Sequence, residues 1–254
     1  MIVTLLGTGT SFGVPMVGCN CDVCTSSRSE NKRLRVSALI QQGDYNLLVD
    51  CSPDFRQQAL RHNITQVNAI LFTHNHSDHI MGIDDLRIYN WRQKKPVQVY
   101  GQDYVIEDIK TRFSYCFLPH RYEGAAPKLD LHILDGNEFE LGPFHIVPVL
   151  AKHWNLPIYG YRIGNLGYMT DCSYIPRESI EKLIGVEILV INALRPNPHP
   201  AHFSLTQAIE VANKIKPQRA YFTHISHKLE HHSTNAMLQQ DNELAYDGLS
   251  FELS

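Results

Sequence analysis

The chain has 254 residues, of which 43% are hydrophobic and 19% are charged, and its formal net charge is -3. This length allows one large domain or two small ones, and the composition is that of an ordinary globular protein. The small negative charge argues against broad affinity for nucleic acids or anionic membranes, and no apolar run approaches the roughly 20 residues that span a bilayer.

Short β-rich runs alternate with helical patterns along the whole chain, which is typical of an α/β protein. The predicted strands are Val3–Leu6, Ser37–Gln41, Tyr45–Val49, Ala69–Phe72, Val97–Tyr100, Leu131–Leu134, His145–Leu150, Tyr159–Ile163, Gly167–Thr170, Ile188–Ile191 and Arg219–Phe222. The helices are predicted to follow Ser52, Asp84, Asp103, Pro176, Ser204 and Ser233. Ser52 is expected to cap its helix with Pro53 at the first helical position, and Ser204 to open a capping box with Gln207.

The N-terminal residues and the pattern of cysteines indicate the cellular compartment in which the protein is expected. Residues 1–7 lack the basic segment of a secretory signal and are predicted to form a strand. The six cysteines occur as a close trio and three single residues, which is not the pattern of a disulfide framework. A reducing cytoplasm is therefore expected, with the single residues Cys51, Cys116 and Cys172 as buried thiols. No linker interrupts the chain, so one domain over residues 1–254 is expected.

A dense group of metal-ligating side chains follows the apolar run at residues 69–72. Four potential ligands lie within six positions, in the pattern H-x-H-x-D-H, and they are His74, His76, Asp78 and His79. Imidazole together with carboxylate suits zinc, manganese or iron. The sequence therefore predicts a metal site where this strand ends.

Four further polar residues follow other predicted strands, and they are Asp50, His153, Asp171 and His224. Each alone is more typical of an ordinary surface or core position. Together with the H-x-H-x-D-H group, however, their number is sufficient for two metal sites.

These residues, in this order, resemble the metallo-β-lactamase superfamily. The resemblance implies a four-layer αββα sandwich with the site at the edge between two sheets. It implies that two divalent metals, zinc or manganese, are bound there. One would be held by His74, His76 and His153, and the other by Asp78, His79 and His224. Asp171 would bridge the two metals, and Asp50 would support the histidine ligands.

A second cluster is predicted from the trio Cys19, Cys21 and Cys24, which has the spacing C-x-C-x-x-C. Three thiolates so close together need a fourth ligand for a tetrahedral structural zinc, and His227 is the best candidate. The alternative is that the three cysteines are unpaired thiols.

The trio, the opening segment Gly7–Pro15 and the segment Thr223–His227 resemble the cyclic-phosphate phosphodiesterase associated with carbon–phosphorus lyase. In that subgroup, three such cysteines and one such histidine bind a structural zinc. This chain departs from the subgroup at Thr10 and Ser11, where small apolar residues are common, so the floor of the pocket is expected to differ.

His202 lies two residues before the predicted helix cap Ser204. It is either an exposed loop histidine or a general acid at the start of a helix, where free N–H groups favour a phosphate anion. Similar phosphodiesterases carry a histidine just before this helix as the proton donor. We therefore predict that His202 is catalytic, together with the metal ligand Asp78.

Two arginines are candidates for binding the substrate. Arg87 either pairs with Asp84 or Asp85 at the surface, or contacts a phosphate or a ligand-supporting group. Arg195, beside a proline-rich loop, has the same two alternatives. Three other histidines are predicted to be surface residues, and they are His199, His231 and His232.

The leading hypothesis is a binuclear metal phosphodiesterase. Its substrate would be a small cyclic phosphate, such as ribosyl 1,2-cyclic phosphate or a 2′,3′-cyclic nucleotide. A metal-bridging hydroxide would attack phosphorus while His202 protonates the leaving alkoxide. A homodimer is compatible with the resemblance, because dimers are common among such proteins.

Three alternatives are weighed against this hypothesis. A tRNA 3′-processing endonuclease shares these ligands, but the chain shows no long basic insertion to grip tRNA, and nucleic acid is a partner only in this case. A thioester hydrolase would not need His202. A catalytically silent zinc-binding module would be expected to have lost some of its ligands.

Overall fold

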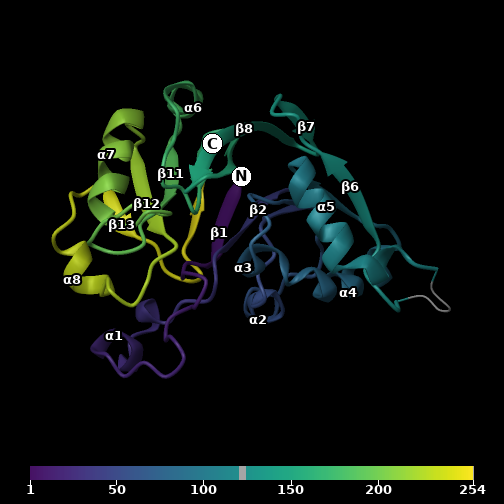
Figure 1. Ribbon diagram of the computed structural model, residues 1–254, viewed down its shortest axis with the longest axis horizontal. Coiled ribbons are helices and arrows are strands. Elements are labelled where there is room, and N and C mark those ends of the chain that lie inside the picture. The colour runs from purple at the N-terminus through teal and green to yellow at the C-terminus, as the bar shows by residue number, and fades with distance from the viewer. Residues whose placement is uncertain (120–123, 254) are drawn as a thin grey trace.

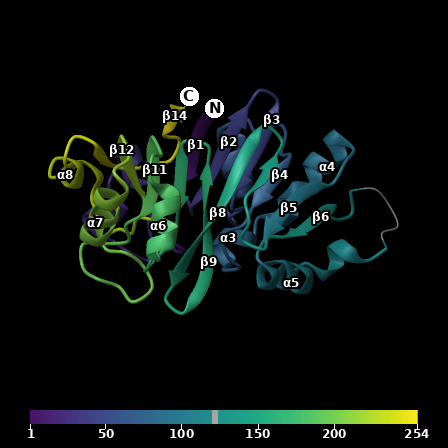
Figure 2. The same ribbon diagram turned by 90° about the horizontal axis from the view of Figure 1, so that it is seen from above.

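The computed structural model describes residues 1–119 and 124–253. In this part of the chain two seven-stranded mixed sheets pack face to face, and helices cover the outer face of each sheet (Figure 1). The view from above shows the same order of layers (Figure 2). The predicted four-layer αββα sandwich is thus confirmed.

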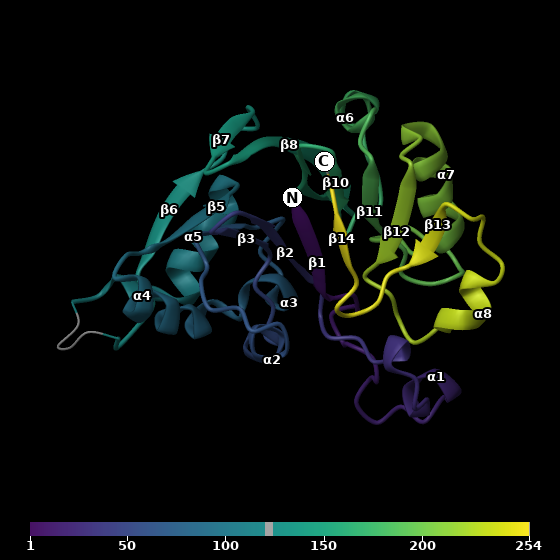
Figure 3. The same ribbon diagram turned by 180° about the vertical axis from the view of Figure 1, so that it is seen from behind.

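The first sheet has the order β14-β1-β2-β3-β4-β5-β6. Its strands are β1 (Ile2–Gly7), β2 (Ser37–Gln42), β3 (Tyr45–Val49), β4 (Ala69–Leu71), β5 (Val97–Gly101), β6 (Leu129–Ile133) and β14 (Ser250–Glu252). Strands β3 to β6 run parallel to one another, whereas β14, β1, β2 and β3 pair antiparallel. The last strand of the chain therefore lies beside the first (Figure 3).

The second sheet has the order β13-β12-β11-β10-β9-β8-β7. Its strands are β7 (Phe139–Leu141), β8 (Phe144–His153), β9 (Leu156–Ile163), β10 (Leu166–Met169), β11 (Ile188–Asn192), β12 (Arg219–Thr223) and β13 (Asn242–Leu244). Strands β7 to β10 form an antiparallel meander, and β10 to β13 run parallel.

Helices connect the parallel strands in both halves. The α-helices of the described residues are α1 (Asp22–Thr25), α2 (Phe55–Arg61), α3 (Ser77–Ile80), α4 (Arg87–Gln93), α5 (Asp103–Arg112), α6 (Arg177–Leu183), α7 (Leu205–Ile215) and α8 (His231–Asn235). Three short 3₁₀ turns are η1 (Ser29–Asn31), η2 (Ile83–Leu86) and η3 (Ser114–Phe117). Within these described helices, none is long and apolar enough to cross a membrane.

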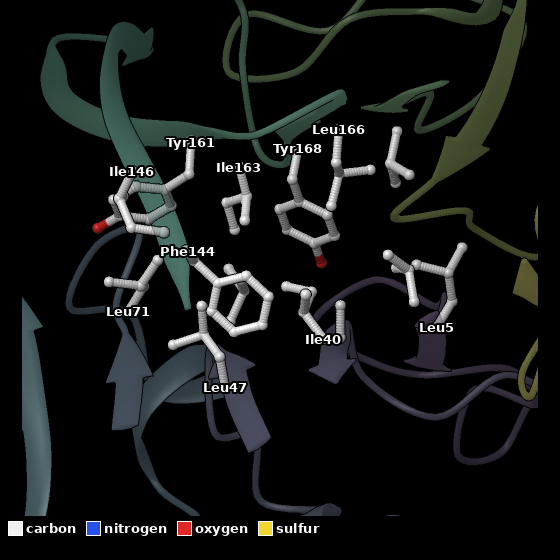
Figure 4. Close-up of a cluster of buried hydrophobic side chains, with 14 of the residues drawn as sticks. Leu5, Ile40, Leu47, Leu71, Phe144, Ile146, Tyr161, Ile163, Leu166 and Tyr168 are labelled. Carbon is white, nitrogen blue, oxygen red and sulfur yellow. The ribbon is translucent and has the colours of Figure 1, made fainter. Parts of the chain in front are cut away.

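Three apolar clusters hold the layers together. The central cluster lies between the sheets and includes Leu47 and Leu71 from one sheet and Tyr161 and Tyr168 from the other (Figure 4). The other two clusters join each sheet to its own helices. The period-two alternation of a strand allows this division: Ile40 of β2 packs in the central cluster, while its neighbour in sequence packs against the helices.

Every predicted strand overlaps an observed one, with differences at the ends. The largest difference concerns β8, which continues to His153 itself, so this residue ends the strand instead of following it. Three short strands were not predicted, and they are β7, β13 and β14. They have three residues each, too few for a periodic pattern to be detected.

Three predicted helix starts are wrong. The helix predicted after Asp84 begins at Arg87, because Ile83–Leu86 form the 3₁₀ turn η2 before it. The helix after Ser52 begins at Phe55, because the Ser52 hydroxyl accepts a hydrogen bond from the Asp54 N–H (3.2 Å) in a turn that precedes the helix. The helix predicted after Ser233 begins at His231, because the Glu230 carboxylate caps it by accepting from the Ser233 N–H (2.7 Å).

The capping box at Ser204 is confirmed. The Ser204 hydroxyl accepts from the Gln207 N–H (3.3 Å), and the Gln207 side chain accepts from the Ser204 N–H (2.9 Å). The thiols of Cys51 and Cys172 are buried as predicted, whereas Cys116 is only half-buried. Helix α7 is therefore anchored at its first residue, directly after the segment that carries His202.

Candidate metal centre

The candidate ligands lie at the ends of strands from both sheets. Asp50 follows β3, and the H-x-H-x-D-H group begins in the loop after β4 and ends within α3, which contains Asp78 and His79. In the second sheet His153 ends β8, Asp171 follows β10 and His224 follows β12. In α/β sheets, side chains at the carboxyl ends of parallel strands converge on one edge, and here the edges of both sheets contribute.

The structure brings all seven predicted ligands together in two groups. Ligand atoms within 4.8 Å of one another form one group of His74, His76 and His153, and another of Asp78, His79, Asp171 and His224. Below, the seven residues together are called the His/Asp cluster.

Asp171 lies between the two groups. Its Oδ2 is 3.4 Å from Nε2 of His79 and 3.9 Å from Nε2 of His74, and its Oδ1 is 3.2 Å from Nε2 of His224. One carboxylate therefore faces histidines of both groups, which is the position that a bridging ligand needs.

Hydrogen bonds orient two of the imidazoles toward this centre. His79 donates from Nδ1 to Asp50 Oδ2 (2.7 Å), and the same carboxylate accepts from the Thr73 N–H (2.9 Å). His153 donates from Nδ1 to the carbonyls of Asp171 (2.9 Å) and Ala201 (2.8 Å). With Nδ1 used in this way, Nε2 of each ring is left as the atom available to a metal.

Buried nitrogen atoms that make no hydrogen bond, although they lie within ion-pair distance of Asp171, face the same centre. Among the described residues, the Nε2 atoms of His74, His79 and His224 are buried and accept or donate no hydrogen bond. Leaving such groups unsatisfied costs about 1–3 kcal/mol each. A cation would satisfy all three, so the donor set fits divalent metals.

The charges of the cluster also favour a cation. Burial alone would raise the pKa of Asp171, but the neighbouring His224 and His79 hold that pKa well below its usual value. Burial alone would lower the pKa of His79, but Asp50, Asp78 and Asp171 raise it well above the usual value. Asp171 is therefore ionised, as is Asp78, whose pKa is also lowered by His79 and His224 against the effect of burial. Both carboxylates attract positive charge, which a metal can supply in place of a proton.

The backbone is strained at three of these strand ends. Asp50, Asp171 and His224 have φ angles of 61°, 59° and 54°, in the left-handed region. This conformation costs roughly 1–2 kcal/mol for a residue with a side chain. No sequence pattern indicated it, because glycine, its usual marker, occupies none of the three positions.

The cysteine cluster also assembles as predicted. Nδ1 of His227 lies 3.2, 3.5 and 3.4 Å from the sulfur atoms of Cys19, Cys21 and Cys24. Tetrahedral zinc with ordinary Zn–S and Zn–N bonds would place these atoms about 3.6 Å apart. The spacing therefore fits a divalent metal with three thiolates and one imidazole.

The cysteine cluster joins two distant segments of the chain. The Ile225 N–H donates to the Thr8 carbonyl (2.8 Å), and the Thr10 N–H donates to the Ile225 carbonyl (3.3 Å). The segment that carries His224 and His227 is thus paired with the N-terminal loop through the backbone, and the cluster adds a side-chain connection.

His202 lies at the His/Asp cluster and not in an exposed loop. Its ring centroid is 4.6 Å from that of His153 and 4.8 Å from that of His224. Burial, together with the imidazole of His224, lowers the pKa of His202 to about 3. Its Nδ1 is buried without a hydrogen-bond partner among the described residues, so the ring is available to a ligand.

The two candidate arginines lie in different places. Arg87 begins α4, is exposed and pairs with the half-buried Asp84, which was one of its two predicted roles. It lines a surface groove with Arg56 and Arg92. Arg195 instead lines a cavity whose wall includes His202 and His224.

Two of the three histidines predicted at the surface are not exposed. His199 is half-buried, because its ring packs beside that of His202 with the centroids 5.1 Å apart. His231 is buried, and its Nδ1 lies 3.3 Å from Nη2 of the buried Arg33. His232 is exposed, as predicted.

Sequence analysis missed a polar network that holds the H-x-H-x-D-H group from outside. Asn75 donates to Asp108 Oδ2 (2.9 Å), which also accepts from Arg112 Nε (2.9 Å). Arg112 in turn donates to the Ser77 hydroxyl (3.2 Å). The only sequence signal is an Asp–Arg pair four residues apart on a helix, which is common on helix surfaces.

Comparisons with known proteins agree with this geometry. Residues 45–225 match the family model described as a beta-lactamase superfamily domain. The crystal structure of a diphosphatase from the PhnP family is 40% identical, with a TM-score of 0.93 over 100% of this chain and 98% of that chain.

Two further proteins extend the comparison. The octanoyltransferase of Porphyromonas gingivalis is 39% identical over 249 residues, which cover 96% of this chain but only 50% of that protein, so the chain spans about half of that relative's length. Zinc-bound PqqB from Methylobacterium extorquens has a TM-score of 0.81 at 19% identity over the full length of both chains, a likeness of fold alone.

The matched segment contains every residue of the His/Asp cluster. The match to the PhnP-family structure extends over the cysteine cluster as well, since it covers the whole chain. The chain therefore belongs to the metallo-β-lactamase superfamily and, within it, to the PhnP family of metal-dependent hydrolases.

Proposed function

We propose that the chain is a phosphodiesterase that hydrolyses a small cyclic phosphodiester, such as ribosyl 1,2-cyclic phosphate or a 2′,3′-cyclic nucleotide. The observation that carries this proposal is the position of His202, whose ring lies within 4.8 Å of the rings of His153 and His224. A proton donor at this place serves a leaving alkoxide, which needs a proton more than a leaving thiolate does.

The His/Asp cluster would hold two divalent metals, for which zinc and manganese are both suitable. His74, His76 and His153 would bind one, Asp78, His79 and His224 the other, and Asp171 both. When bound, such a pair activates water near neutral pH and neutralises the charge that develops on phosphate. The cysteine cluster would hold one structural zinc through Cys19, Cys21, Cys24 and His227.

His202 would carry the proton for the leaving oxygen. In the free protein its pKa is about 3, because burial and His224 disfavour the protonated ring. A phosphate anion bound beside the ring favours the protonated form, and the free N–H groups at the start of α7 stabilise the same anion. Protonation of His202 would thus accompany the binding of substrate.

The activities named for the similar proteins indicate which other compounds should be tested as substrates. A diphosphatase of the same family supports hydrolysis at phosphorus and adds diphosphates to the compounds to be tested. Because one relative is an octanoyltransferase, an octanoyl thioester is included among the compounds, and it also tests the thioesterase alternative. Pre-tRNA tests the endonuclease alternative.

The test uses metal-loaded protein whose metal content is measured by elemental analysis. We expect the cyclic phosphodiesters to be cleaved fastest among cyclic nucleotides, ribosyl cyclic phosphate, diphosphates, pre-tRNA and octanoyl thioester. Failure to cleave any cyclic phosphodiester, with two metals bound at the His/Asp cluster, would overturn the proposal.

The role of His202 is tested separately. His202→Ala should lower kcat by roughly 10²- to 10⁴-fold with a much smaller change in KM. His232→Ala, at an exposed histidine outside the site, is the control and should leave both constants unchanged. Equal activity of His202→Ala and the wild type would remove His202 from the mechanism.

A further inference from the structure

His224 differs from the other buried histidines of the His/Asp cluster in how its ring is held. Nδ1 of His79 lies 2.7 Å from a carboxylate oxygen, Nδ1 of His153 bonds to two backbone carbonyls (2.9 and 2.8 Å), and Nδ1 of His74 lies 3.0 Å from a hydroxyl. In the described part of the chain, Nδ1 of His224 is buried and has no hydrogen-bond partner. No such contact therefore orients this ring.

The ring of His224 lies nearly parallel to two other imidazoles. Its plane is inclined by 21° to that of His202 and by 20° to that of His79, and the centroids are 4.8 and 6.3 Å away. Parallel rings resist tilting, but they can still slide past one another. The position of Nε2, the atom that lies 3.2 Å from Asp171 Oδ1, is therefore set by the backbone of His224.

The backbone after His224 is fixed from two sides. The Ile225 N–H donates to the Thr8 carbonyl (2.8 Å), and the Ile225 carbonyl accepts from the Thr10 N–H (3.3 Å). The Ile225 side chain packs in the cluster between the second sheet and its helices. His224 keeps its left-handed conformation (φ 54°) beside this fixed residue. One of the two supports is thus the N-terminal loop.

This N-terminal loop has no share in the apolar core. Residues 8–35 contribute no side chain to any of the three apolar clusters. Helix α1, which begins directly after Cys21, lies beyond the ends of the two sheets in the front and back views (Figures 1 and 3). Segments without an apolar core depend on other cross-links, such as a bound metal. The cysteine cluster supplies such a cross-link here.

His227 connects that cross-link to the catalytic ligand. It lies three residues after His224, and its Nδ1 is within 3.5 Å of all three sulfur atoms of the cysteine trio. The loop and the segment of residues 224–227 therefore meet twice, through the backbone of Ile225 and through His227. A metal in the cysteine cluster would fix the second meeting point and so restrict the movement of His224.

The two halves of the His/Asp cluster differ in their link to this segment. The first group consists of His74, His76 and His153, and the second of Asp78, His79, Asp171 and His224. Only the second group contains a residue of the segment.

We infer that His227 is a positioning residue for His224, and that a metal in the cysteine cluster strengthens the binding of a metal by the second group and not by the first. The inference rests on the two metal clusters of the proposed function and is independent of the substrate. Because coupling between binding sites is reciprocal, a metal in the second group strengthens binding at the cysteine cluster by the same factor.

Variants that damage one catalytic group at a time test the selectivity. His76→Ala removes a ligand of the first group only, and Asp78→Ala removes a ligand of the second group only. In each background, the zinc dissociation constant of the intact group is measured by chelator competition, with and without Cys21→Ser. We expect Cys21→Ser to weaken the second group by at least about 5-fold and the first by less than about 2-fold. Equal changes in the two backgrounds, or none in either, would overturn the inference.

Two further variants separate loss of the metal from a general change in the fold. Cys21→His keeps four ligands for tetrahedral zinc, so it should restore the affinity of the second group. Cys116→Ser, at a thiol that is half-buried like Cys21 but belongs to neither metal cluster, should leave both affinities unchanged. Zinc bound by Cys21→His without recovery of the second group would contradict the inference.

A reciprocal measurement leaves the cysteines intact. Cobalt(II) bound by thiolates gives a charge-transfer absorption band that the sulfur-free His/Asp cluster cannot produce, so this band titrates the cysteine cluster alone. Asp78→Ala should shift the midpoint of the titration to a cobalt concentration at least about 5-fold higher, whereas His76→Ala should not shift it. Equal midpoints in the two variants would overturn the inference. Absence of the band in the wild type would refute the structural metal site itself, and the inference with it.

Discussion

Replacing Asp50 with asparagine is expected to weaken metal binding at the His/Asp cluster by about 10- to 100-fold, the usual effect of removing a group that orients a metal-binding histidine. Asp50 is completely buried, and its carboxylate accepts from Nδ1 of His79 at 2.7 Å and from the Thr73 N–H at 2.9 Å. Asparagine keeps the shape but loses the charge that makes the first of these hydrogen bonds strong. The expected loss corresponds to about 1.4–2.8 kcal/mol of binding free energy.

The assay is competition with a chromophoric chelator at fixed pH, and the matched control is Asp247→Asn. Asp247 is also a buried carboxylate that accepts from a threonine, through the Thr8 N–H (2.9 Å) and hydroxyl (2.8 Å), but it belongs to neither metal cluster. Asp247→Asn alters a buried hydrogen-bonded carboxylate in the same way, and it should leave metal affinity within about 2-fold. Equal metal affinity in Asp50→Asn and wild type, or equal losses in the two variants, would refute the reasoning.

Three further predictions follow from the same contacts. Cys21→Ser should reduce zinc content by one ion per chain and lower the melting temperature, measured by elemental analysis and thermal unfolding; no change in either would contradict a structural zinc. Asp108→Asn should weaken metal affinity by a smaller factor than Asp50→Asn, because it removes the charge that holds Asn75 between two ligands; Glu107→Gln, on the same helix in an exposed pair with Lys110, is the control and should have no effect. Burial raises the pKa of Asp247 to about 6, whereas in the unfolded chain the carboxyl has a pKa of about 3.9. The folded state therefore binds this proton more tightly, so the free energy of unfolding should fall as pH rises from about 4 to about 6. Urea unfolding at several pH values should show this decline in the wild type and not in Asp247→Asn, and equal slopes would contradict it.

The strands and the ligand positions could be predicted because each depends on local pattern. Buried strands form short apolar runs, and the H-x-H-x-D-H group directly follows one of them. Once that group indicated a metal site, polar residues at the ends of other predicted strands were candidates for the remaining ligands. His153, Asp171 and His224 were found in this way, although His153 proved to be the last residue of its strand.

The groups around the ligands could not be predicted, because they depend on which distant elements meet. Arg87 is close to the metal-binding group in sequence, but α4 leads it to another surface, while Arg195 is far away in sequence and lines the cavity beside His202. The hydrogen bond from Asn75 to Asp108 forms only because α5 packs beside the loop after β4. Neither the positions of the two arginines nor the contact between Asn75 and Asp108 can be predicted from the spacing of residues in the sequence.

The left-handed backbone conformation of the residues that follow β3, β10 and β12 explains how two sheets with apolar faces also carry a metal site. Along an extended strand, side chains point alternately to the two faces of the sheet, and both faces here are occupied by apolar clusters. At Asp50, Asp171 and His224 the chain leaves this alternation, with φ between 54° and 61°, and all three side chains contact one another or His79 at the His/Asp cluster.

Surrounding contacts maintain this strained conformation. The Asp50 N–H donates to the Leu71 carbonyl (3.0 Å). Directly after Asp171, the Cys172 N–H donates to Asn192 Oδ1 (2.6 Å). Strained backbone persists where the rest of the fold determines it, and it concentrates at functional sites. The same conformation occurs at four non-glycine residues of the described chain outside the site, but only at Asp50, Asp171 and His224 does it coincide with a strand end whose side chain takes part in the His/Asp cluster, and there it allows ligands of both sheets to converge.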